Sequence, residues 1–328
     1  MRLISISDYN HATMQLGRPV YDNQKRILLT AGRTIDPRYL KRLEDMDIRY
    51  LFVEDSVSEG ITMDEMMDMP TWLDAIEAVQ QVYKVAATNK PFELKDIQQM
   101  TNKLIDEVNK RKAIVLIPTT SIAEDLRPYA HSVNVALLAL QVGKKLSSIN
   151  NLQMRDLALG VLLHDIGKAI TSNDENHPQT GFDYLRKVRG LSLLSAHVAF
   201  QHHEQFNGTG FPRGITGKEF HEYAQLCGIC NLYDNMISRD HIPPHMAMEM
   251  IMTKSNVGFS EEIVHAFIHS IPSYTPGTKV VLSNGEKAIV TKIKSHMQRP
   301  VIRIIESNKE VSLEEDHTLL ITGTFDEK

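Results

Sequence analysis

Histidines and one aspartate in the middle of the chain have the types and spacing of metal ligands. Of the 14 histidines in 328 residues, six fall in this region: His131, His164, His177, His197, His202 and His203. His164 is followed at once by Asp165 in LLHDIGKAI. Imidazole and carboxylate groups can together hold a divalent ion, and a nearby ammonium such as Lys168 can bind phosphate. The pair alone also fits a capped helix end with a salt bridge, but the other histidines favour a metal site.

The segments that carry these residues are predicted to be helical. Apolar residues recur every three or four positions in WLDAIEAVQQVYKVA, IQQMTNKLIDEV, AHSVNVALLALQVGKKL, LQMRDLALGVLLHDIGKAI and GFDYLRKV. Helices joined by short connections can bring side chains from several segments into one bundle core. We therefore expect a helical region over about residues 71–270 that gathers the histidines around one site.

The stretch QHHEQFNGTGFPRG combines two adjacent histidines with a loop rich in glycine. Adjacent residues on a helix point about 100° apart. Either one of His202 and His203 is therefore a surface residue, or both reach into a shared polar site. The glycines that follow would let the backbone approach a ligand closely.

Both ends of the chain have a different character. Near the N-terminus, RPVYDNQKRILLTAG predicts a β-hairpin, Asp36 and Pro37 predict the start of a helix, and IRYLFVED predicts a strand. Near the C-terminus, Asn284-Gly285 predicts a hairpin, and RPVIRIIE, KEVSL and LLITGTF predict three more strands. The expected parts are an N-terminal α+β unit (1–62), a helical connector (63–114), the histidine-bearing helical domain (115–272) and a small antiparallel β domain (273–328).

Charge, hydropathy and cysteine content exclude several classes of protein. A net charge of -5 without a basic patch argues against a nucleic acid polymer as partner. No apolar run approaches the ~20 residues of a membrane span, and the first residues do not form a signal peptide, so we expect a cytoplasmic protein. The two cysteines, Cys227 and Cys230, lack the second ligand pair of a structural zinc site and are expected in the core.

The motifs together resemble the HD-GYP branch of the HD phosphohydrolase superfamily. His131, HDIGK, HPQTG and HHEQFNGTGFPRGITGKEF occur in the order of that family and cover about residues 115–270. The resemblance implies a mainly α fold, an HD-type helical bundle flanked by the two small terminal units. It also implies an enzyme, a metal-dependent phosphodiesterase that hydrolyses cyclic di-GMP to linear pGpG, GMP or both.

The resemblance also assigns roles to individual residues. It implies two divalent ions, iron or manganese, bridged by Asp165, with a metal-bound hydroxide attacking phosphorus in line. The implied ligands are His131, His164, Asp165, His177, His202, His203 and Asn231. Asp165 and Lys168 would be catalytic. The implied substrate contacts are Lys168, Gly210, Phe211, Pro212, Arg213, Lys218 and Arg239, of which the last three also fit solvated surface charges. Glu204 is expected to orient a histidine, and His197 to be structural.

The chain departs from the family pattern at several positions. Asn231 stands where the family has a ligand aspartate, which removes one negative charge and weakens one metal position. Asp234, three residues on, is left open as a substitute. Phe211 replaces the GYP tyrosine, and Arg127 replaces a glutamate found in members with a third metal. The segment AITSNDEN is short, so we expect part of a lid over the site to be missing.

Three functions follow from these observations. The first is a cyclic di-GMP phosphodiesterase with a binuclear or weakened metal site. The second is a weakened or inactive member that acts as a cyclic di-GMP receptor or protein-interaction module, as Asn231 and Phe211 suggest. The third is an HD phosphohydrolase of another nucleotide. The terminal units leave open a homodimer or a protein partner.

Overall fold

The computed structural model of the protein describes residues 1–22 and 24–325. Asn23, in the predicted N-terminal hairpin, and residues 326–328 of the predicted β domain lie outside this description. The chain divides into two compact units. The helical unit comprises residues 67–116 and 128–271, and the terminal unit comprises residues 1–66, 117–127 and 272–328.

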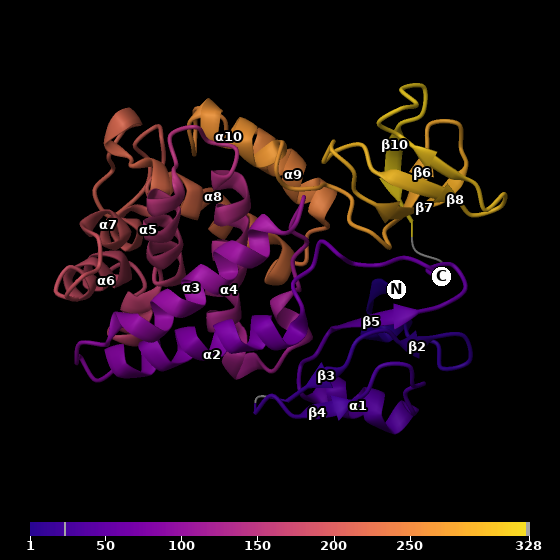
Figure 1. Cartoon of the computed structure of the whole chain (residues 1–328), viewed down its shortest axis with the longest axis horizontal. Helices are drawn as coiled ribbons and strands as arrows, with labels where there is room; N and C mark the ends of the chain where they lie inside the picture. The colour runs from indigo at the N-terminus through magenta and orange to yellow at the C-terminus, as the bar shows by residue number, and fades with distance from the viewer. Residues whose placement is uncertain (23, 326–328) are drawn as a thin grey trace. The chain divides into compact units, whose positions relative to one another are not determined.

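The helical unit consists of helices connected by turns (Figure 1). Its helices are α2 (Met69–Ala86), α3 (Leu94–Asn109), α4 (Arg127–Gly143), α5 (Asn151–Leu162), α6 (His177–Leu185), α7 (Leu193–Gln201), α8 (Glu222–Ser238), α9 (Pro244–Met252) and α10 (Glu261–Ile268). Local sequence sets several of the starts. Asp68 caps α2 by accepting from the Thr71 amide, and Asn150 and Gln153 form a capping box at α5.

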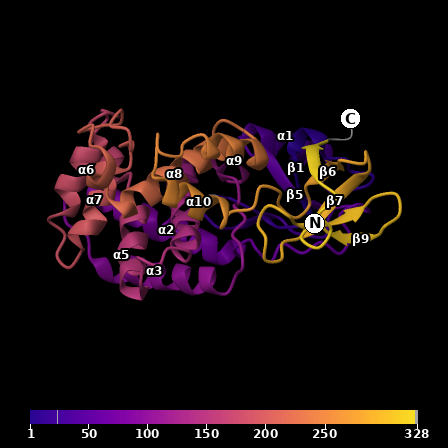
Figure 2. The ribbon, with the colours of Figure 1, turned by 90° about the horizontal axis from the view of Figure 1, so that it is seen from above.

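Helix packing in this unit surrounds α4, whose residues from Ser132 to Gly143 are all buried. A helix that is apolar on all sides belongs in the centre of a bundle. Helix α7 packs against α5 and α6, while α8 packs against α9 and α10; these neighbours lie side by side in Figures 1 and 2. Helices α2 and α3, predicted as a connector, belong to the same unit as the histidines. The predicted division into four parts stays a prediction.

The terminal unit contains the predicted small β structures. Its strands are β1 (Arg2–Ser5), β2 (Gln15–Leu16), β3 (Val20–Tyr21), β4 (Ile27–Leu29), β5 (Tyr50–Glu54), β6 (Lys279–Leu282), β7 (Lys287–Lys292), β8 (Val301–Ile304), β9 (Glu310–Ser312) and β10 (Ile321–Thr324). They form antiparallel sheets in the orders β1-β5-β2, β3-β4 and β10-β6-β7-β8-β9. Asp36 caps α1 (Pro37–Asp45), and Gly285 takes a positive φ in the β6–β7 turn.

The fold class predicted from the sequence is confirmed, with a mainly helical centre and small β structures from both ends. Cys227 and Cys230 are free and buried, as expected. In the segment before α2, the side chains of Met63, Met66 and Met67 are buried. Among the described residues, no helix has the length and apolarity needed to cross a membrane.

Candidate metal centre

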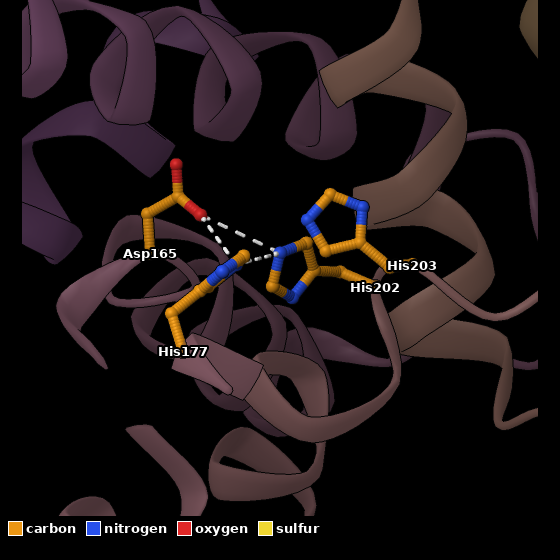
Figure 3. A group of neighbouring side chains, drawn as sticks. All are labelled: Asp165, His177, His202 and His203. Carbon is orange, nitrogen blue, oxygen red and sulfur yellow. Dashed lines mark hydrogen bonds and ion pairs between the residues drawn. The ribbon is translucent and has the colours of Figure 1, made fainter. Parts of the chain in front are cut away.

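Four stretches of the helical unit bring the expected ligands together. His131 lies one turn into α4, His164 and Asp165 follow the end of α5, His177 is the first residue of α6, and His202 and His203 follow α7. Their ligand atoms form two groups in which all atoms lie within 4.8 Å of one another. One group contains Asp165, His177, His202 and His203 (Figure 3), and the other contains His131, His164 and Asp165. Asp165 belongs to both.

Backbone carbonyl groups fix the orientation of three of these imidazoles. Nδ1 of His164 donates to the Val161 carbonyl at 2.8 Å, and Nδ1 of His202 donates to the Ala199 carbonyl at 2.9 Å. Nδ1 of His177 donates to the carbonyl of Asp174. A neutral imidazole that donates through Nδ1 carries a lone pair on Nε2. All three rings therefore present an acceptor nitrogen to the site.

These acceptor atoms face one another without a proton donor between them. Nε2 of His177 and Nε2 of His202 are 3.3 Å apart, and Asp165 Oδ1 lies 3.3 and 3.5 Å from them. Nε2 of His164 and Oδ1 of Asp165 are buried and lack a well-formed hydrogen bond within the described part of the chain. Two nitrogens bound to one ion at about 2.1 Å are about 3.0–3.4 Å apart at octahedral to tetrahedral angles. The donor set thus fits a divalent cation.

Asp165 is the electrostatic centre of the site. Burial acts against its charged form, but the surrounding groups, among them the ammonium of Lys168, outweigh burial and hold the pKa of Asp165 well below its ordinary value. Nζ of Lys168 lies 2.7 Å from Asp165 Oδ2. The carboxylate is therefore ionised, with one oxygen toward the histidines and the other toward an ammonium.

His131 is held differently from the other histidines. Its Nδ1 contacts Asp234 Oδ2 at 2.6 Å, and its Nε2 contacts Asn231 Oδ1 at 2.9 Å. Burial opposes protonation of His131, but the hydrogen bond and the charge of Asp234 outweigh it and raise the pKa of His131. Asn231 thus lies beside an expected ligand, whereas Asp234 contacts the opposite side of the ring.

The loop after His203 is anchored by Glu204. Its carboxylate accepts hydrogen bonds from the backbone amides of Arg213 and Ile215 at 2.8 and 3.2 Å, and Glu204 is buried. The expectation that Glu204 orients a histidine is wrong, because both oxygens hold the loop. Phe211, at the tip, stacks on His203 with ring centroids 4.6 Å apart and an interplanar angle of 12°.

We expect Gly210→Ala to damage this loop. A Cβ at this position would lie 2.3 Å from the Gln205 nitrogen and 2.4 Å from Glu204 Cα, and backbone atoms cannot move aside cheaply. The substitution should lower the free energy of unfolding by about 2–3 kcal/mol, as measured by urea denaturation. Gly323→Ala is the control, because a Cβ there meets nothing within 4 Å. Equal stability of the two variants would contradict the close approach.

The remaining expected substrate contacts are distributed unevenly. Pro212 is exposed beside Phe211, and the guanidinium of Arg213 lies 5.8 Å from the centroid of the Phe200 ring. Lys218 lies in the exposed turn Gly217–Glu219. Arg239 pairs with the adjacent Asp240 at 2.9 Å, at the end of α8. Within the described part of the chain, neither Lys218 nor Arg239 contacts the site histidines.

Arg127 and His197 have defined partners outside the two histidine groups. Arg127 donates to Asp47 Oδ2 at 2.6 Å within the terminal unit. His197 packs against the Phe182 ring, with centroids 4.8 Å apart, and lies outside the histidine groups.

Sequence reasoning overlooked three residues next to the site, all of them buried. They are Trp72, Tyr83 and Asn134. The Tyr83 hydroxyl lies 3.3 Å from Ser132 Oγ, and burial followed by the charge of Asp165 raises the pKa of Tyr83 well above its ordinary value. The one available signal was an asparagine within the apolar stretch VNVALLAL, three residues after His131.

We expect the metal-free protein to lose stability in mild acid. Burial lowers the pKa of His164, of His202 and, to about 2, of His203. Their neutral forms contribute stability that is complete above about pH 6.5, the ordinary histidine pKa, and is lost as pH falls below it. The pKa of His131 is raised, so this residue gains stability as pH falls, but the three histidines with lowered pKa values outweigh it. Urea unfolding with chelator should show a free energy of unfolding at least about 2 kcal/mol lower at pH 5 than at pH 7; a flat or rising profile would contradict this.

Comparison with known proteins adds a family and several relatives. The model of the HD domain family matches residues 129–236. The cyclic di-GMP phosphodiesterase PA4108 of Pseudomonas aeruginosa is 26% identical over 232 residues, which cover 65% of this chain and 56% of that protein. A cyclic di-GMP phosphodiesterase of Thermotoga maritima is 26% identical over 44% of this chain and 45% of its own. A 3'3'-cGAMP-specific phosphodiesterase of Vibrio cholerae is 30% identical over 34% of this chain and 28% of its own. The chain thus spans about half the length, or less, of these relatives.

Proposed function

Because this chain belongs to the HD domain family and carries the motifs of its HD-GYP branch, we propose that it is a metal-dependent phosphodiesterase that hydrolyses cyclic di-GMP. The proposed products are linear pGpG, GMP or both. The relatives named as cyclic di-GMP phosphodiesterases support the substrate class. The observation that carries the proposal is the set of inward Nε2 atoms around Asp165.

The residues of the site have distinct tasks in this reaction. His177, His202, His203 and Asp165 would hold one ion, and His131, His164 and Asp165 would hold the other. Two divalent ions, iron or manganese, would supply Lewis acidity to lower the pKa of water and to neutralise charge on the phosphoryl oxygens. Histidine binds zinc, copper and iron alike, so these ligands do not identify the metal. The assignment of iron or manganese therefore rests on the family resemblance.

Lys168 and the loop would bind the nucleotide. The ammonium of Lys168 is half-exposed and lies 2.7 Å from Asp165 Oδ2, and it would contact a phosphate that approaches the carboxylate. Phe211 is 39% exposed, which leaves ring surface available for a guanine base. Arg213 extends from the same loop and could pair with a second phosphate. Lys218 and Arg239 would contact the nucleotide only if their side chains moved from the positions they have in this structure.

A second function, a cyclic di-GMP receptor with little turnover, is favoured by Asn231. An amide oxygen is a neutral ligand, so the His131 side would hold its ion more weakly than the same site with a carboxylate at position 231. The terminal unit would then serve as a site for a protein partner or for a second copy of the chain. The cytoplasmic location expected from the sequence stays a prediction.

Turnover measurements separate these functions. The full chain, loaded with manganese or iron without oxygen, is incubated with cyclic di-GMP or with 3'3'-cGAMP, and the linear products are separated and quantified. We expect linear product from cyclic di-GMP, and no product from His202→Gln. His265→Gln, which changes an exposed histidine of α10, is the matched control and should keep full activity. Binding without turnover would favour the receptor, and faster cleavage of 3'3'-cGAMP would overturn the proposed substrate.

A further inference from the structure

We infer that helix α2 positions the metal ligand His131 through a buried chain of hydrogen bonds that runs from Trp72 through Asn134 and Asp234. Trp72 lies outside residues 129–236, the segment that matches the HD domain family. The inference rests on the metal centre of the proposed function. It assigns positioning roles, because none of these three residues would touch the substrate.

The chain begins at the indole of Trp72. Its Nε1 donates to Asn134 Oδ1 at 3.0 Å, and both side chains are fully buried. An indole nitrogen can only donate, so this bond requires the amide oxygen of Asn134 to point toward α2. The amide nitrogen must then point the other way, and it donates to Asp234 Oδ1 at 3.0 Å.

Asp234 connects Asn134 to His131 and fixes the orientation of the imidazole. Its Oδ1 also accepts from Ser238 Oγ at 3.1 Å, and its Oδ2 contacts His131 Nδ1 at 2.6 Å. With Oδ1 occupied by two donors, the carboxylate plane is fixed and Oδ2 is left for the imidazole. A histidine that donates Nδ1–H to a carboxylate has Nε2 available to a metal, and the carboxylate raises its basicity.

This arrangement decides between two roles for Asp234. A direct ligand would need a carboxylate oxygen free to face the ion, whereas here Oδ2 lies against His131 and Oδ1 against two donors. Asp234 is therefore a positioning residue and does not replace the ligand aspartate absent at position 231. The geometry also makes α2, predicted as a connector, a structural part of the metal centre.

The test measures manganese binding to the metal-free full chain, by titration followed with electron paramagnetic resonance. Trp72→Phe keeps the aromatic ring and removes the N–H, and should weaken manganese binding about threefold. Asn134→Leu removes the middle of the chain and should weaken binding about tenfold. In the double variant, the loss should remain about tenfold, because Trp72 acts through Asn134.

Gln141→Leu is the matched control for a purely structural effect. Gln141 is a buried amide on the same helix, α4, and donates to the Lys112 carbonyl at 2.7 Å, away from His131. Urea unfolding of every variant gives its stability, and the control should lose stability while its manganese affinity changes less than twofold. If Asn134→Leu does not fold, the manganese affinity of Trp72→Phe compared with that of Gln141→Leu still tests the inference.

The outcomes are distinct for the inference and for the proposed function. Manganese affinity of Trp72→Phe equal to that of the control would overturn the inference, and so would multiplied losses in the double variant. Wild-type protein that binds manganese but does not cleave cyclic di-GMP overturns the proposed activity and leaves the inference standing. Wild-type protein that binds neither manganese nor ferrous iron overturns both.

Discussion

Asp165→Asn is expected to abolish stable metal binding and to reduce turnover by at least about a thousandfold. Among the described residues, Asp165 is the member that the two groups of ligand atoms share. The amide keeps the size of the carboxylate but removes its charge and offers one oxygen in place of two. Nε2 of His177 and of His202 would remain 3.3 Å apart without an anion to offset a bound cation.

The measurement for this variant is metal content after anaerobic purification, with turnover of cyclic di-GMP on the same sample. Asp183→Asn is the control, because Asp183 is a partly exposed residue of α6 that pairs with Arg186. The control should keep wild-type metal content and activity. Unchanged metal content in Asp165→Asn would show that the ion is held elsewhere.

Asn231→Asp is expected to tighten the weaker metal position about tenfold and to raise turnover where that position limits the reaction. The new carboxylate would lie beside Nε2 of His131, where Asn231 Oδ1 now lies at 2.9 Å. Without metal, it would add a negative charge near Asp165 and Asp234. The metal-free variant should therefore unfold at a lower temperature than the wild type, and the metal-loaded variant at a higher one.

Thermal unfolding with and without manganese checks this change of sign. Asn235→Asp is the control, because it adds the same charge one turn further along α8, where Asn235 now donates to Asn231. If activity appears only in Asn231→Asp, the natural protein is a receptor. Equal activity and equal metal affinity in the variant and the wild type would show that the amide of Asn231 weakens neither metal binding nor turnover.

Much of the fold follows from local sequence signals. The Asn284-Gly285 turn, the Asp36 cap and the period of the helices depend on neighbouring residues, so the sequence alone predicts them. The gathering of His131, His164, His177, His202 and His203 follows from motif order, which carries the family geometry with it. Ligand assignment for each residue stays a prediction until metal is measured.

The partners of buried polar groups were not predictable in the same way. The sequence predicts that Glu204 orients a histidine, yet in the folded loop its carboxylate accepts hydrogen bonds from the amides of Arg213 and Ile215. Helical spacing places Asp234 near Asn231 and so allows it as a ligand, but spacing does not reveal that Asn134 donates to one of its oxygens. Contacts between α2 and α4 join residues 62 positions apart, which no local pattern encodes.

The most direct test of the account is metal analysis of the full wild-type chain purified without oxygen. We predict two equivalents of iron or manganese, with one equivalent removed first by dilute chelator, as expected for the side that contains Asn231. Asp165→Asn, purified in parallel, should contain none. Wild-type protein with no bound transition metal, before and after incubation with iron or manganese, would contradict the metal centre and the hydrolytic function proposed for it.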